Sequence, residues 1–120
     1  MKALSVRQPY ANQIARGIKT LEIRSWSTPY RGPLVICATA RPDIGFRAHH
    51  SELGCFICVV DLVKVIPWTQ ALTREAYCSP GDWFPDMMGW VLENPRQLHH
   101  THIKGRLGLF EIPDTDLVYG

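Results

Sequence analysis

The stretch Lys19-Thr20-Leu21-Glu22-Ile23-Arg24-Ser25-Trp26 alternates between two kinds of side chain. Successive side chains of an extended strand point to opposite faces, so a period of two separates the stretch into two sides. We therefore predict a strand over residues 19–26 with one buried side and one polar side. The buried side carries Leu21, Ile23 and Ser25, and the polar side carries Thr20, Glu22, Arg24 and Trp26.

The residues on either side of this strand predict a strand and a helix before it and a strand after it. Residues 3–6 are short and half apolar, which favours a strand. Pro9 then opens a segment, residues 10–16, whose apolar side chains recur at helical spacing, and Gly17 ends it. After the strand, residues 27–33 form a turn cluster that leads into an apolar strand over residues 34–38.

The remaining chain is richer in strand signals than in helix signals. Residues 55–68 are the longest such run and predict the central strand of a sheet, after a loop over residues 39–54 with one helical turn. A helix is predicted over 69–77, a loop over 79–89, and strands over 89–93 and 104–112. The expected class is α+β and β-rich: a closed or nearly closed small barrel of about five to six strands with two or three short helices.

Size and composition indicate one domain spanning residues 1–120. Apolar residues make up 46% and charged residues 20% of the chain, which excludes the disordered class. The longest apolar run, residues 55–60, is far shorter than the roughly 20 residues of a membrane span, and the first residues contain no secretory signal. We therefore expect a cytoplasmic protein with reduced cysteines.

Charge is distributed unevenly along the chain. Residues 1–50 hold eight Lys and Arg against Glu22 and Asp43, whereas residues 51–120 hold five against nine acidic residues. A basic first half is typical of an anion-binding face, although chance segregation is a competing explanation in so small a protein.

The sequence contains a candidate zinc site, but we do not predict that it binds metal. Cys55 and Cys58 have the Cys-x-x-Cys spacing, with His99, His100 and His102 as further donors. These cysteines begin a strand, however, and residues three apart in a strand point to opposite faces. We expect buried thiols, no metal and no cofactor, and we interpret His49 and His50 as solvated.

Three ordered segments resemble the ASCH domain family: residues 4–11, residues 17–26 and residues 31–34. Residues 89–92, 95–96 and 105–110 resemble its closing strands, and the likeness is weakest over residues 40–88. The resemblance implies a PUA-like β-barrel whose cleft is lined by the Gly-x-Lys-x-x-Glu-x-Arg segment. It also implies association with RNA or another nucleic acid.

The leading interpretation is a module that binds RNA or a modified nucleotide in a basic cleft. Cationic side chains contact phosphates, Glu22 orients a cation or accepts from a base, and aromatic side chains stack on bases. The alternative for Glu22 and Arg24 is a plain salt bridge, and Trp90 is expected in the core. The candidate binding residues are Arg7, Gln8, Lys19, Thr20, Glu22, Arg24, Trp26, Tyr30 and Arg31.

Two other functions stay open. One branch of ASCH-like proteins deacetylates a modified cytidine with a lysine that matches Lys19 and a threonine three residues later. Glu22 occupies the threonine position, so that activity is not carried over, but a hydrolase acting on a nucleoside or RNA phosphodiester remains an alternative with Lys19 and Glu22 as catalytic residues. The other alternative is a protein-interaction domain, which predicts an exposed apolar patch.

Overall fold

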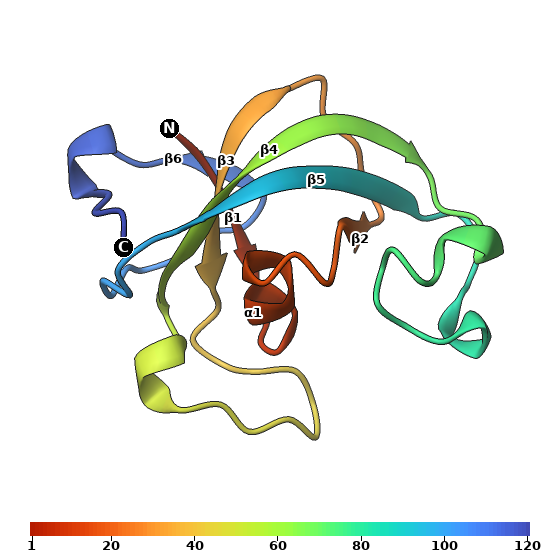
Figure 1. The fold of residues 1–120 in the computed structure, drawn as a ribbon, viewed down its shortest axis with the longest axis horizontal. Helices are drawn as coiled ribbons and strands as arrows, with labels where there is room; N and C mark the ends of the chain where they lie inside the picture. The colour runs from red at the N-terminus through yellow and green to blue at the C-terminus, as the bar shows by residue number, and fades with distance from the viewer.

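The computed structural model describes residues 1–120, which contain one six-stranded sheet in the order β2-β5-β4-β3-β1-β6 (Figure 1). Only β1 and β3 run parallel, and the other neighbours are antiparallel. The strands are β1 (Lys2–Val6), β2 (Leu21–Arg24), β3 (Gly32–Ala38), β4 (Cys55–Pro67), β5 (Met88–Gln97) and β6 (Leu109–Glu111), and the α-helix is α1 (Tyr10–Ala15).

The sheet curls into a half-barrel, so the predicted β-rich α+β class and strand number are confirmed. Strands β4 and β5 arch along the curl in Figure 1. The order starts at β2 and ends at β6, and these two edge strands do not pair with each other. The hydrogen-bonded ladder therefore leaves one side of the barrel open.

Helix α1 fills the inside of the curl, where it packs against β3, β4 and β5. Its buried residues Ala11 and Ile14 join a core cluster that also contains Trp90, which is fully buried as predicted. Gly17 follows the helix at φ +74°, a left-handed conformation that glycine adopts without steric cost. The predicted helix is confirmed, with its end one residue earlier than expected.

Strand β2 places Leu21 and Glu22 on opposite faces, as the alternation predicts, and Glu22 on the polar side faces the interior of the barrel. Leu21 is buried in a small outer cluster with Trp68 and Ala76. Glu22 lies directly opposite Trp90 in the antiparallel register, and directly opposed residues point to the same face. Glu22 therefore points into the barrel and is only 7% exposed.

The helix predicted over residues 69–77 is also wrong, because only a 3₁₀ helix over Gln70–Leu72 forms. The backbone carbonyl of Glu75 accepts from the amides of Thr20 and Leu21, and the carbonyl of Ala76 accepts from the Lys19 ammonium. These carbonyls bind the start of β2, so the segment follows the edge of the sheet instead of winding into a helix.

Other element ends differ from the prediction. Strand β5 extends to Gln97, past the predicted end at residue 93. Its register with β4 shifts around Asn94, and the pairing resumes at Arg96. Strand β6 is shorter than residues 104–112, since Gly108 adopts φ +69° just before it. The helical turn predicted within residues 39–54 forms as a 3₁₀ helix over His50–Glu52, whereas the 3₁₀ helices over Pro80–Asp82 and Asp114–Asp116 were not predicted.

The two cysteines with metal-like spacing lie on the same side of β4, contrary to the prediction. The register with β3 shifts between Ile36 and Cys37, which leaves Ile57 as an extra residue and reverses the alternation. Cys55 and Cys58 therefore both join the main core cluster. Burial raises the pKa of the Cys58 thiol to about 12 and that of Cys55 to about 11.

All four cysteines are free thiols. No group of three or more His, Cys, Asp or Glu side chains is arranged to hold a metal ion. Among the helices, none combines the length and the apolar character needed to cross a membrane.

The contact between β5 and β2 gives a test of the fold. A Cβ atom at Gly89 would lie 2.9 Å from three atoms of the buried Leu21 side chain, whereas one at Gly81 would meet nothing within 4 Å. We predict that Gly89→Ala lowers the free energy of unfolding by about 1–3 kcal/mol, because the edge strand must move away. Gly81→Ala should change it by less than about 0.5 kcal/mol. Urea unfolding of both variants measures this difference, and equal losses would contradict the packing described.

Candidate functional site

A cavity of about 720 Å³ lies at the open side of the half-barrel. This volume is in the range of cavities that enclose a small molecule or one unit of a larger ligand. One wall comes from β1, β2 and the start of α1, and includes Ser5, Arg7, Tyr10, Lys19, Glu22, Arg24 and Trp26. The facing wall comes from residues 68–87, and includes Trp68, Ala76, Tyr77, Cys78, Asp82, Phe84 and Met87, while Arg106, Leu107 and Gly108 complete the mouth.

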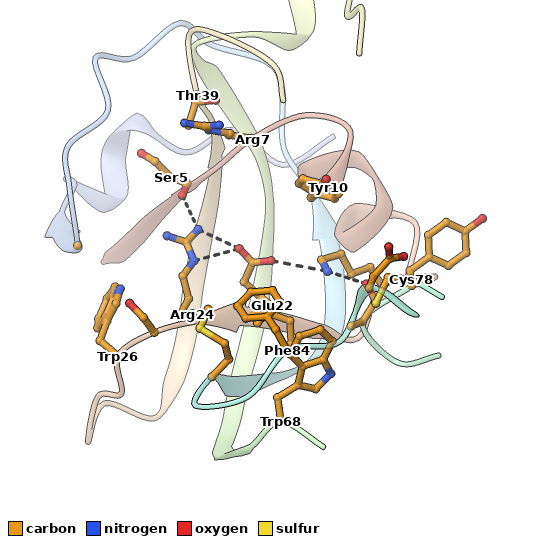
Figure 2. Close-up of a pocket in the computed structure, with 18 of the residues that line it drawn as sticks. Ser5, Arg7, Tyr10, Glu22, Arg24, Trp26, Thr39, Trp68, Cys78 and Phe84 are labelled. Carbon is orange, nitrogen blue, oxygen red and sulfur yellow. Dashed lines mark hydrogen bonds and ion pairs between the residues drawn. The ribbon is translucent and has the colours of Figure 1, made fainter. Parts of the chain in front are cut away.

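The Glu22 carboxylate is the centre of the inner end (Figure 2). The Arg24 side chain donates to its Oε2 atom from Nε at 3.0 Å and from Nη2 at 2.9 Å. Lys19 Nζ lies 3.8 Å from Oε1 on the other side. Glu22 is therefore a buried carboxylate held between two cations.

Arg24 also connects two strands that the backbone ladder leaves apart. Its Nη2 atom donates to the carbonyl oxygen of Ser5 on β1 at 2.8 Å. The pairing of β1 with β6 ends at Leu4, so Ser5 lies beyond the edge that β6 covers. The guanidinium thus joins β2 to β1 across the open side of the barrel.

Lys19 lies in the wall as a buried, constrained cation. Its Nζ atom donates to the carbonyl oxygen of Ala76 at 2.7 Å and lies 5.4 Å from the centroid of the Tyr10 ring. Burial lowers the pKa of Lys19, and the Glu22 carboxylate opposes that shift. The side chain is 6% exposed, so it forms part of the packed wall rather than a cationic rim.

Arg7 is the exposed cation of the strand wall. Its side chain is 59% exposed, and Nη1 lies 3.5 Å from Asp43 Oδ1. The Tyr10 hydroxyl donates to the other oxygen of Asp43. This hydrogen bond raises the pKa of Tyr10 to about 12 and lowers the pKa of Asp43. Asp43 therefore holds Arg7 and Tyr10 at the mouth of the cavity.

Aromatic rings line the cavity on both walls. Trp26 packs edge-on against the buried Trp90, with ring centroids 4.8 Å apart. Trp68 and Phe84 pack edge-on against each other within the facing wall, with centroids 5.8 Å apart, and Phe84 is 50% exposed. Aromatic side chains therefore contribute to the lining of both walls.

The structure brings five of the nine candidate residues together: Arg7, Lys19, Glu22, Arg24 and Trp26 line the cavity. The other four, Gln8, Thr20, Tyr30 and Arg31, lie outside it. Gln8 is buried and donates to Asn12 and to the carbonyl of Glu52. Thr20 lines a separate shallow hollow on the outer side of β2. The Tyr30 hydroxyl donates to Pro33, and Arg31 donates to the carbonyls of Thr28 and Tyr30, so both stabilise their own turn.

The facing wall and the loop at the mouth were missed by the sequence prediction. Residues 68–87 had only a weak helix pattern followed by a Pro- and Gly-rich stretch. Trp68, Trp83 and Phe84 were the available signal, since aromatic residues so close together in a loop-rich segment need a surface to pack on.

The cavity is positive on balance. Four cationic side chains line it, three of them from the basic first half, against the carboxylates Glu22 and Asp82. Glu22 is committed to Lys19 and Arg24, whereas Arg106 has no ion pair and Arg7 has one exposed partner. Arg7 and Arg106 are therefore the cations of the cavity that are not held by Glu22.

Comparisons with known proteins agree with this geometry. The family model of the ASCH domain matches residues 4–109. The chain is 60% identical to the human protein named activating signal cointegrator 1 in an alignment 114 residues long. The alignment covers 79% of this chain and 19% of that protein. The mouse protein of the same name is 55% identical, and the alignment again covers 79% of this chain and 19% of that protein. The chain thus spans about a fifth of the length of these curated relatives.

A solved structure has the same fold. The ASCH protein from Zymomonas mobilis superimposes with a TM-score of 0.71, covering 96% of this chain and 89% of that one, at 16% sequence identity. A point variant of the same protein gives a TM-score of 0.68 over 94% of this chain. At this identity the likeness shows the fold alone.

The link from Arg24 to Glu22 and Ser5 predicts a large stability effect. Arg24→Ala should lower the free energy of unfolding by about 2–4 kcal/mol, because the buried Glu22 carboxylate loses its closer cation. The matched control is Arg96→Ala, which removes a more exposed pair at 3.0 Å from Asp61 and should cost less than about 1 kcal/mol. Urea unfolding compares the two, and an Arg24 variant no weaker than the control would contradict the link.

Proposed function

The chain belongs to the ASCH domain family, and from this membership and the cavity we propose that it binds single-stranded RNA by enclosing one nucleotide unit. The observation that carries the proposal is the combination of aromatic walls, a polar inner end and a cationic mouth in one cavity. The aromatic walls and the polar inner end suit a base, and the cationic mouth suits a phosphate.

The aromatic walls suit a base. Trp26 lies on the strand side, and Trp68 and Phe84 lie on the facing side, where Figure 2 shows them beyond the Glu22–Arg24 pair. A base entering between the walls gains stacking contacts that do not depend on its identity. Single strands expose such bases, whereas a duplex stacks them inside, so the proposed ligand is single-stranded.

The inner end can hydrogen-bond to a base edge without breaking its own contacts. Arg24 uses Nε and Nη2 for Glu22 and Ser5, which leaves Nη1 as a free donor. Glu22 Oε1 has only the long 3.8 Å contact to Lys19, which leaves it as an acceptor. The inner end therefore offers a ligand one free donor and one free acceptor, at opposite ends of the Glu22–Arg24 pair.

We also propose that the protein works in a reducing compartment, with the cytoplasm as the predicted location. Its four cysteines are free thiols, and burial raises the pKa of Cys37 to about 12. Unpaired, protonated thiols are typical of proteins that do not meet an oxidising environment.

The proposal predicts that Phe84 contributes to RNA affinity by stacking. Phe84→Ala should weaken binding of a short mixed-sequence single-stranded RNA by about 1–3 kcal/mol, roughly five- to a hundredfold. The matched control is Phe46→Ala, because Phe46 is 40% exposed and does not line the cavity. Fluorescence anisotropy at low and moderate salt measures both variants, and wild-type affinity should fall as salt rises.

Absence of RNA affinity at low salt would contradict the proposal. Such a result would favour the protein-interaction alternative, which the exposed side chains of Tyr77 and Leu107 at the cavity mouth also fit. Equal weakening by the two phenylalanine substitutions would show that RNA binds elsewhere.

A second candidate function is hydrolysis of a modified nucleoside or an RNA phosphodiester. One observation favours it: Lys19 lines the cavity with a lowered pKa, 3.8 Å from the Glu22 carboxylate. An amine with a lowered pKa beside a carboxylate is an arrangement that active sites use.

The two functions are separated by one assay. If the chain is a hydrolase, mass spectrometry after incubation with RNA and acetylated nucleosides will show products, and Lys19→Ala will abolish them while RNA binding survives. A chain that binds RNA and forms no product from any of these substrates would exclude the hydrolase candidate.

A further inference from the structure

The segment of residues 104–108 crosses the cavity mouth with few contacts of its own. Arg106, Leu107 and Gly108 line the cavity, and Leu107 is 99% exposed. None of the five residues takes part in a backbone hydrogen bond, a side-chain hydrogen bond or an ion pair. The segment is anchored at its ends, where Ile103 donates to the Gly54 carbonyl and Leu109 pairs with Leu4. Such a segment changes conformation at low cost.

Gly105 positions this segment against the strand that carries Arg7. A Cβ atom at Gly105 would lie 2.6 Å from the Ser5 hydroxyl oxygen, so the backbone passes directly over Ser5. Ser5 and Arg7 are two positions apart along an extended chain, so their side chains point to the same side. Figure 2 shows both on one side of the Glu22–Arg24 pair, opposite Trp68 and Phe84. Arg106 and Arg7 therefore flank the same side of the mouth.

These two arginines are the cations of the cavity that remain available to a ligand anion. Lys19 and Arg24 are committed to Glu22. Arg106 has no acidic partner, and Arg7 has an exposed contact of 3.5 Å with Asp43 that water already weakens. A phosphate oxygen accepts charge-assisted hydrogen bonds from arginine, and two guanidinium groups can share one phosphate.

We propose that residues 104–108 form a loop that closes over the bound ligand and places Arg106 beside Arg7 as a phosphate clamp. This inference rests on the proposed function and narrows it: the ligand is a phosphorylated nucleotide unit, not a free base or nucleoside. Closure also covers the exposed Leu107 side chain with the ligand and the aromatic wall, which removes apolar surface from water. The loop thereby couples recognition of the phosphate to enclosure of the base.

Trypsin reports the closure directly, because it cleaves after Lys104 and Arg106 only while the segment is open and accessible. We expect single-stranded RNA and nucleoside 5′-monophosphates to slow cleavage at both positions by about tenfold when nine-tenths of the protein is bound, in proportion to the fraction closed. The matching nucleosides should leave it unchanged at the same concentration. Cleavage after the exposed Arg47, which lies outside the cavity, serves as the internal reference.

Binding measurements test the clamp itself. Arg106→Ala should weaken RNA binding about tenfold and reduce the slope of log affinity against log salt by about 0.7, the value for one lost phosphate contact on a single strand. Arg16→Ala is the control, because it removes an exposed arginine that does not line the cavity. It should change the RNA affinity and the salt slope only slightly. Gly105→Ala should also weaken RNA binding, since the added methyl group pushes the loop away from Ser5, while the unfolding midpoint stays close to wild type.

The outcomes separate the two proposals. If nucleosides bind as tightly as their 5′-monophosphates and Arg106→Ala behaves like Arg16→Ala, the clamp is wrong while binding in the cavity stands. If RNA protects neither Lys104 nor Arg106 although Phe84→Ala weakens binding, the loop does not close. If no RNA, nucleotide or nucleoside binds, both proposals are wrong.

Discussion

The structure depends on one side-chain link, from Arg24 to the Glu22 carboxylate and the Ser5 carbonyl. The sheet curls far enough to enclose a core, yet its edge strands β2 and β6 do not pair. At that gap the Arg24 guanidinium joins β2 to β1, and Glu22 orients the guanidinium from the same strand. A buried ion pair of this kind is a specific rather than a strong source of stability, because desolvation opposes the attraction. Its consequence is geometric, since it joins β2 to β1 through a side chain where no backbone ladder connects them.

The two ends of the cavity offer different interactions to a ligand, and this link forms the inner end. At the inner end Lys19 and Arg24 share the Glu22 carboxylate, so that end offers directional hydrogen bonds to a ligand. Charges at the mouth are unmatched, because Arg106 has no partner and Arg7 has an exposed one. Aromatic rings from both walls also line the cavity. A ligand with a base at one end and a phosphate at the other fits this division better than an anion or an apolar molecule alone.

The sequence predicted the secondary-structure elements better than the tertiary contacts between them. The alternation in residues 19–26, the apolar run that became β4 and the helix between Pro9 and Gly17 all rest on local periodicity, which reports which residues share a face. Periodicity does not report how deeply a face is buried, so the burial of Glu22 at 7% exposure was not predicted. The bulge at Ile57 and the use of the Glu75 and Ala76 carbonyls by β2 and Lys19 arise from tertiary pairing, which no local pattern encodes. For the same reason the cavity wall over residues 68–87 and the Arg106 loop were missed, and Tyr30 and Arg31 were grouped with residues whose cavity they do not line.

The most direct test of the central claim is a titration of ¹⁵N-labelled protein with single-stranded RNA, followed through the indole and guanidinium N–H resonances. Trp26, Trp68 and Arg24 line the cavity, whereas Phe56 and Phe110 belong to the core cluster on the other side of the sheet. If RNA enters between the aromatic walls, the Nε–H resonances of Trp26, Trp68 and Arg24 will shift together in proportion to occupancy while the backbone amides of Phe56 and Phe110 stay in place. Shifts confined to residues 98–102 and 117–120, with the three cavity resonances unmoved, would contradict it.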